Sequence, residues 1–119
     1  MKPAAEDLAQ RRPVWLALSE LFLDTDVGAL LPSLAHDLAA SAYSEAELER
    51  ILREEVQPLL QWNLLSVAGV WDGFDPGWLE QSILARRHRL RLPFLFPHEE
   101  WRQLALFIRE ARERPVAAG

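Results

Sequence analysis

The sequence predicts an all-α protein that forms one compact domain of about five helices. Residues that favour helices, namely Ala, Leu, Glu, Arg and Gln, make up 67 of the 119 residues. The β-branched residues Val, Ile and Thr number only 10, which is too few to furnish a sheet. Apolar residues also recur at the spacing of one helix face. We expect residues 1–119 to form a single domain, with a core over about 12–114 and frayed ends.

The first helix is expected to begin at Pro13, because proline suits a first turn, where a missing N–H has no helical partner. Turn residues over 24–28 would end it, and its inner face would carry Val14, Trp15, Leu18, Leu21 and Phe22. A second helix is expected over about 29–41, with an inner face of Leu31, Leu34, Ala35 and Leu38.

Ser44 and Glu47 predict the start of a third helix, because a serine followed three residues later by a glutamate forms a capping box. Pro58 is expected to kink or restart this helix, since its ring would clash with the carbonyl of Glu54. The expected inner face is Leu48, Ile51, Leu52, Val56 and Leu59.

A loop then separates this helix from the next one. A short helix would continue to about Val67, followed by a turn at Gly69 and a loop over 72–75. Asp75 and Pro76 predict a new helix start, with the aspartate as cap and the proline in the first helical position. The expected inner residues of this helix are Trp78, Leu79, Ile83 and Leu84.

The C-terminal part predicts one more helix. The preceding helix would end in the basic run 86–91, because cations are favoured near a helix C-terminus. A connector over 94–96, bounded by prolines, leads to a last helix that begins at His98. Its expected inner face is Trp101, Leu104, Ala105, Ile108 and Ala111.

Composition excludes several protein classes. The chain has no cysteine, which excludes disulfide scaffolds, cysteine zinc sites, iron–sulfur clusters and thiol nucleophiles. The apolar runs are short and the first residues lack the apolar core of a signal peptide, so we expect a cytoplasmic protein that does not enter a membrane. The net charge is −5, and acidic side chains concentrate in residues 1–60. This balance favours a basic partner over nucleic acid, whose phosphates would repel the acidic helix after Ser44.

No motif indicates a cofactor, a metal site or a catalytic centre. The run Asp-Thr-Asp-Val-Gly at 24–28 is similar to the start of a calcium-binding loop, but Ala35 stands where that loop needs a bidentate glutamate. His36, His88 and His98 lack metal-ligand spacing. The serines lie in no nucleophile elbow or phosphate loop. We therefore expect no catalytic residues, no metal and no cofactor.

Tryptophan is abundant, with five residues in the chain, of which Trp62, Trp71 and Trp78 lie close together in sequence. Trp15 and Trp101 fall on inner helix faces. Burial of all five in the core is the expected arrangement. The alternative is that Trp62 or Trp71, which flank a loop, lines a groove or a partner surface, because tryptophan is enriched in binding hot spots.

Two segments have distinctive sequences. They are Arg-Pro-Val-Trp-Leu-Ala-Leu-Ser-Glu-Leu-Phe-Leu-Asp-Thr at 12–25 and Asn-Leu-Leu-Ser-Val-Ala-Gly-Val-Trp-Asp-Gly-Phe-Asp at 63–75. Together they resemble a family of small bacterial proteins classed as a domain of unknown function, over roughly residues 12–87. The resemblance implies a small bacterial helical domain, and it brings no catalytic residues and no cofactor.

The leading functional hypothesis is a non-enzymatic protein-interaction module of a regulatory or inhibitory kind. One concrete version is an immunity protein that neutralises a basic toxin, since acidic side chains would steer such a partner. The expected contact residues are Asp24, Asp26, Glu45, Glu47, Glu49, Glu54 and Glu55.

Two alternatives stay open. The first is an enzyme or small-ligand binder with a pocket at Trp62, Trp71, Asp72 and Asp75, in which the aspartates act as paired carboxylates. The favoured roles of the two aspartates are nevertheless structural, because Asp72 with Gly73 suits a turn and Asp75 suits a helix cap. The second alternative is self-association through the apolar segment 94–96.

Overall fold

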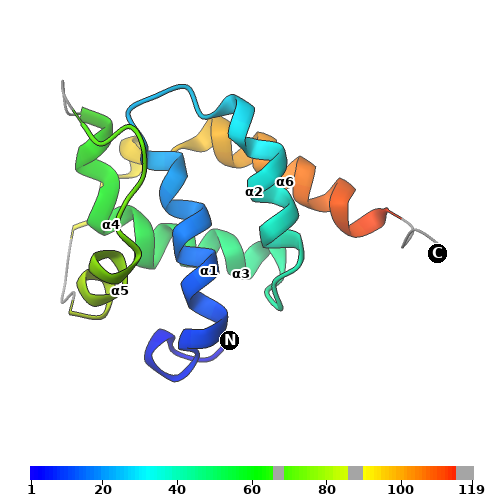
Figure 1. The fold of residues 1–119 in the computed structure, drawn as a ribbon, viewed down its shortest axis with the longest axis horizontal. Helices are drawn as coiled ribbons and strands as arrows, with labels where there is room; N and C mark the ends of the chain where they lie inside the picture. The colour runs from blue at the N-terminus through cyan, green and yellow to red at the C-terminus, as the bar shows by residue number, and fades with distance from the viewer. Residues whose placement is uncertain (66–68, 86–89, 115–119) are drawn as a thin grey trace.

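The computed structural model describes residues 1–65, 69–85 and 90–114, and every regular element in these ranges is helical. This confirms the all-α prediction. The molecule measures 45 × 33 × 24 Å, and α1 runs through its middle, across α3 (Figure 1). The elements are η1 (Ala4–Glu6), α1 (Leu8–Ser19), η2 (Glu20–Phe22), η3 (Gly28–Leu30), α2 (Leu31–Ala39), α3 (Glu45–Ile51), η4 (Leu52–Val56), α4 (Gln57–Leu60), η5 (Gln61–Leu65), α5 (Pro76–Ala85), η6 (Pro93–Leu95) and α6 (His98–Glu113).

Helix α1 begins at Leu8, so the predicted start at Pro13 is wrong. The Asp7 carbonyl accepts a hydrogen bond from the Arg11 N–H at 2.9 Å, and the Arg11 side chain is buried. Pro13 therefore lies inside the helix, where it cannot donate to the Ala9 carbonyl. The added turn is held by the contacts of Arg11 with distant residues, which a local sequence pattern does not reveal.

Helix α2 and the start of α3 agree with the sequence. The four residues predicted for the inner face of α2 are buried. The capping box of α3 is also present: Ser44 Oγ accepts from the Glu47 N–H at 3.1 Å, and Glu47 Oε1 accepts from the Ser44 N–H at 2.9 Å. An N-cap of this kind contributes about 1 kcal/mol to stability.

A continuous helical run covers residues 45–65, but its geometry changes before Pro58. Helix α3 passes into η4, a π-helical turn, which leads into α4 and then into the 3₁₀ turn η5. A π-turn is wider than an α-turn, so it relieves the clash that the Pro58 ring would make with the Glu54 carbonyl. The apolar inner face predicted for this run is buried throughout.

Helix α5 begins where the sequence predicts. Asp75 Oδ2 accepts from the Trp78 N–H at 2.8 Å, and Pro76 is the first helical residue. Val67 and most of the basic run 86–91 lie outside the described residues. The connector before α6 forms the single 3₁₀ turn η6, and α6 begins at His98 as predicted.

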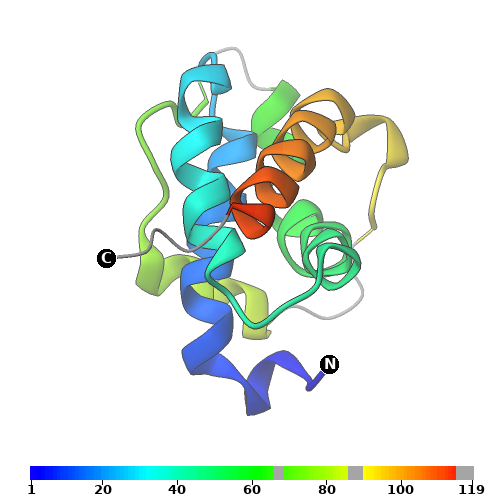
Figure 2. The same cartoon turned by 90° about the vertical axis from the view of Figure 1, so that its right-hand side faces the viewer.

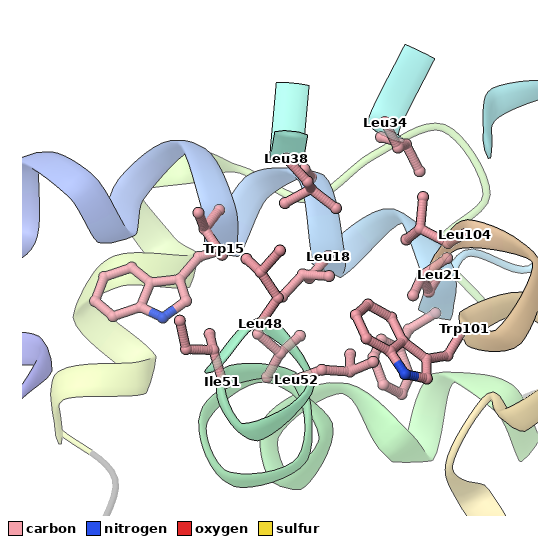
Figure 3. Close-up of a cluster of buried hydrophobic side chains, with 14 of the residues drawn as sticks. Trp15, Leu18, Leu21, Leu34, Leu38, Leu48, Ile51, Leu52, Trp101 and Leu104 are labelled. Atoms are coloured by element: carbon pink, nitrogen blue, oxygen red, sulfur yellow. The ribbon is translucent and has the colours of Figure 1, made fainter. Parts of the chain in front are cut away.

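The core lies between α1, α2, α3 and α6. Trp15 sits toward one end of the core and Trp101 toward the other, and leucines such as Leu18, Leu48 and Leu52 fill the space between them (Figure 3). Helices α2 and α6 pack side by side (Figure 2). None of the helices in the described ranges combines the length and the apolar character needed to cross a membrane.

Candidate functional site

An open apolar groove of about 490 Å³ lies where α4 and η5 face the loop over 69–75 and the start of α5. The aromatic part of its wall is formed by Phe74 and Trp78, whose rings stack with a centroid distance of 6.4 Å. The groove is lined by Leu59, Leu60, Asn63, Val70, Gly73, Phe74, Asp75 and Trp78.

Hydrogen bonds from Asn63 hold the loop side of this groove in place. Its Nδ2 donates to the Phe22 carbonyl at 2.6 Å and to the Val70 carbonyl at 3.0 Å. Its Oδ1 accepts from the Val70 N–H at 2.9 Å. One amide side chain thus joins η5 to both η2 and the loop, and sequence analysis did not single it out.

Asp24 also forms hydrogen bonds with this loop. Its N–H donates to the Val70 carbonyl at 2.7 Å, and its Oδ2 accepts from the Gly69 N–H at 3.1 Å. The loop also depends on Gly73, which has a φ of +144° that L side chains rarely adopt. Where the sequence predicted a turn at Asp72 and Gly73, the structure has a bend at Asp72.

The five tryptophans divide into two groups, so the expected burial of all five is wrong. Trp15 and Trp101 are buried, as predicted, and their indole N–H groups donate to Glu55 and Glu49, each at 2.8 Å. Trp62, Trp71 and Trp78 are 52%, 66% and 47% exposed. Leu84 of α5, also predicted to face inward, is 42% exposed.

Of the three exposed tryptophans, only Trp78 is a lining residue of the groove. Trp62 precedes the lining residue Asn63, and Trp71 follows the lining residue Val70. Trp78 is exposed because α5 packs on α1 through its other face, which buries Leu79 and Ile83. Position beside or within a loop, where apolar periodicity is lost, was the signal for the exposure of Trp62, in η5, and of Trp71, in the loop itself.

The glutamates of the α3–η4 segment hold the fold together. Glu45 is bound by Arg109 of α6 at 2.6 and 2.7 Å, and Glu54 is paired with Arg50 at 2.7 Å. Glu49 accepts from Trp101, and Glu47 belongs to the capping box. The hydrogen bonds from Arg109 lower the pKa of Glu45 below its ordinary value, and those from Ser44 lower the pKa of Glu47.

Glu55 joins a buried network around Arg11 that sequence analysis missed. The Arg11 guanidinium is 1% exposed and donates to both oxygens of Glu55 at 3.1 and 2.9 Å. It also donates to the Tyr43 hydroxyl at 3.2 Å, and that hydroxyl donates to Asp7. Burial would lower the pKa of Arg11, but the hydrogen bonds to Glu55 and Tyr43 raise it above its ordinary value. The spacing of Arg11 and Trp15, four residues apart on one helix face, was the available signal.

The remaining acidic residues singled out from the sequence, Asp26, Asp72 and Asp75, are all exposed. Asp26 is exposed and its Oδ1 accepts from the Gly28 N–H at 2.9 Å. Asp72 is exposed beside the groove, and Asp75 lines it while capping α5.

Comparison with known families identifies the chain. A match to the domain of unknown function DUF7079 covers residues 9–115, from the first turn of α1 to just beyond α6. The chain belongs to the DUF7079 family. The match extends well beyond the region around 12–87 in which the sequence showed the resemblance. No curated protein and no solved structure matched the chain.

The DUF7079 chain has a second, more polar groove of about 530 Å³ between α1 and α2. Glu20 and Asp37 both line it. Burial, and then the nearby Asp37 carboxylate, raise the pKa of Glu20 above its ordinary value. His36 and Ser41 also line this groove.

Several polar side chains in these grooves of the DUF7079 chain already have hydrogen-bond partners within the fold. Ser41, which follows α2 and lines the second groove, donates to the Leu38 carbonyl at 2.6 Å. Asp75, one of the two predicted paired carboxylates, uses Oδ2 to cap α5. Within the described residues, no three His, Asp or Glu side chains come together as a metal site. The exposed aromatic surface is the strongest functional feature that the structure offers.

Proposed function

We propose that this DUF7079 chain is a non-enzymatic protein-interaction module that binds its partner through the aromatic surface around the groove of Leu59, Asn63, Phe74 and Trp78. One observation carries the proposal: three of the five tryptophans are about half exposed, and one of them, Trp78, lines this groove, while Trp62 and Trp71 each adjoin a lining residue in the sequence. Tryptophan is rare on solvated surfaces and is enriched in binding hot spots, where its large ring is buried by a partner.

The acidic residues have a different part in this proposal from the contact role expected at first. The helix glutamates are occupied by arginines and indoles within the chain, so they supply long-range charge more than direct contact. A net charge of −5 would accelerate the approach of a basic partner. This supports a regulatory or inhibitory role of the immunity type, and we place it in the bacterial cytoplasm, as the sequence led us to expect.

A small-ligand site is the second candidate, because the groove lies where the sequence predicted a pocket. Its volume of about 490 Å³ falls in the usual range for such sites, ~300–1,000 Å³. A small-molecule site, however, buries most of its ligand, and this groove is open along one side. Self-association through 94–96 would depend on Phe94, which is 73% exposed, because Leu95 is buried and Phe96 is buried under the Arg53 guanidinium, 4.0 Å from its ring.

Site-specific photo-crosslinking in the producing cells tests the interaction role. The photoreactive residue p-benzoylphenylalanine would replace Trp71 or, as a control, Leu106, an exposed leucine of α6. We expect one discrete heavier species from the Trp71 position and none from the Leu106 position. Equal labelling from both positions, or none from either, would contradict the proposal. An adduct between two copies of the chain would favour self-association instead.

A further inference from the structure

The segment of sequence that supplies the groove lining is depleted in positive charge, and the basic run 86–91 follows it. Residues 13–85 contain 12 acidic side chains and only two basic ones, Arg50 and Arg53. Both arginines are committed within the fold: Arg50 binds Glu54 at 2.7 Å, and Arg53 lies 3.6 Å from Glu49 and stacks over Phe96. The groove therefore lies within a strongly acidic part of the chain.

The groove itself combines apolar and acidic groups. Its lining has one carboxylate, that of Asp75, and no arginine, lysine or histidine. Asp72 lies exposed next to the lining residue Gly73, and Asp24 holds the loop through Gly69. Aromatic faces and carboxylates with no cation among the described lining residues form a surface complementary to an apolar segment that carries cations.

The Asn63 side chain and Asp75 Oδ2 in the groove already have hydrogen-bond partners, which limits the backbone conformation of an occupant. Asn63 makes three hydrogen bonds with Phe22 and Val70, and Asp75 Oδ2 accepts from Trp78. The described residues contain no strand whose edge could pair with an extended peptide. A segment buried here must therefore satisfy its own backbone N–H and C=O groups, as a helix does.

We propose that the groove binds a short amphipathic helix of a partner protein, with apolar side chains flanked by arginine or lysine. This inference rests on the proposed function and specifies the chemistry of its partner. The apolar side chains pack on Leu59, Phe74 and Trp78. The cations lie beside the aromatic faces of the groove and toward Asp72 and Asp75, in the way that Arg53 lies over Phe96 within this chain.

Three fluorescein-labelled synthetic peptides of equal length test the inference against the full chain. The first has leucines at helical spacing and arginines on the other face, the second replaces the arginines with glutamates, and the third scrambles the order of the first. Fluorescence anisotropy should show at least tenfold tighter binding of the first peptide than of either other. Failure of the first peptide to bind, or equal binding of the scrambled peptide, would overturn the inference.

Two variants locate the binding site. Trp78→Ala should weaken binding of the arginine peptide at least tenfold, whereas Leu106→Ala, an exposed change on α6, should leave it unchanged. Asp72→Lys changes an exposed residue, so the fold should persist, as circular dichroism would verify. This variant should weaken the arginine peptide and strengthen the glutamate peptide. Unchanged binding in both Trp78→Ala and Asp72→Lys would place the peptide elsewhere and refute the inference.

The crosslinking result distinguishes the two levels of the proposal. A discrete adduct at the Trp71 position without binding of the arginine peptide would reject the basic helix and retain the interaction role. The absence of both would reject the interaction role as well.

Discussion

The Arg11 guanidinium illustrates how a single buried charge organises one end of the core. It is held by Glu55, Tyr43 and Asp7, and Glu55 also accepts from Trp15. Arg11→Met would leave the Glu55 carboxylate partly buried without its cation, so we expect a loss of about 3 kcal/mol in the free energy of unfolding. Arg12→Met, at the exposed neighbour, should cost less than about 1 kcal/mol. Urea denaturation measures both, and similar losses would contradict the structural role of Arg11.

Glu20 yields a prediction about how stability depends on pH. Its pKa is raised by burial and by Asp37, so the folded state binds more protons than the unfolded state. The contribution of Glu20 to stability should therefore fall as pH rises from the ordinary pKa of glutamate through the raised one. Glu20→Gln removes this effect: the variant should be more stable than wild type near about pH 7, and the difference should disappear near about pH 3. Thermal denaturation across this range, with Glu110→Gln as an exposed control, would show whether the gain is specific to Glu20.

The burial of some residues could be predicted from the sequence, because it follows from helical spacing. Trp15 and Trp101 repeat in phase with Leu18 and Leu104, so their burial followed from periodicity alone. Trp78 also lies on a helix, yet α5 turns that position outward, because only the face with Leu79 and Ile83 meets α1. Which face of a short helix is buried depends on its docking, and docking is not encoded in the spacing of one element.

The loop of residues 69–75 depends on a close approach between Gly69 and Asn63. A Cβ at Gly69 would come 2.7 Å from Asn63 Oδ1 and 3.1 Å from its backbone oxygen. Gly69→Ala should therefore displace the Asn63 side chain and cost about 1–3 kcal/mol. Gly77→Ala, in α5, meets only an ordinary contact at 3.4 Å and should gain up to about 1 kcal/mol from helix propensity. Urea denaturation of the pair tests this; equal stabilities would show that the loop tolerates the clash.

At the level of elements, local chemistry predicted starts better than extents. Ser44 with Glu47 and Asp75 with Pro76 mark true helix starts, since their partners lie within one turn. The helix start predicted at Pro13 was wrong because buried contacts of Arg11 extend the helix toward the N-terminus. These contacts are made with residues 32 and 44 positions away, which a local rule for proline does not take into account. The groove was located near 62–75 from aromatic content, but the role of Asn63 was not, because its partners are backbone groups of distant segments.

Charge is segregated over the whole molecule. Residues 86–119 contain eight basic and four acidic side chains, in contrast to the acidic segment 13–85. Helix α6 brings part of this basic region onto α3, where Arg109 pairs with Glu45. Arg112 of α6 donates to the carbonyl of Leu38, in α2, and to that of Tyr43, which follows α2. The acidic charge that stays uncompensated in this way belongs to exposed residues such as Asp26, Asp37 and Asp72. Such a charge distribution acts on a binding partner while it approaches from a distance, whereas the groove acts once the partner is in contact.

We therefore expect charge and groove to control different rate constants for the arginine peptide. Asp26→Asn with Asp37→Asn changes two exposed residues outside the groove lining, so it should slow association and leave dissociation nearly unchanged. Trp78→Ala should instead speed dissociation. Stopped-flow fluorescence measures both rates, and raising NaCl from about 50 to about 500 mM should slow association of wild type more than that of the double variant. A change in dissociation in the double variant would mean that these aspartates contact the peptide, and the separation of steering from binding would be wrong.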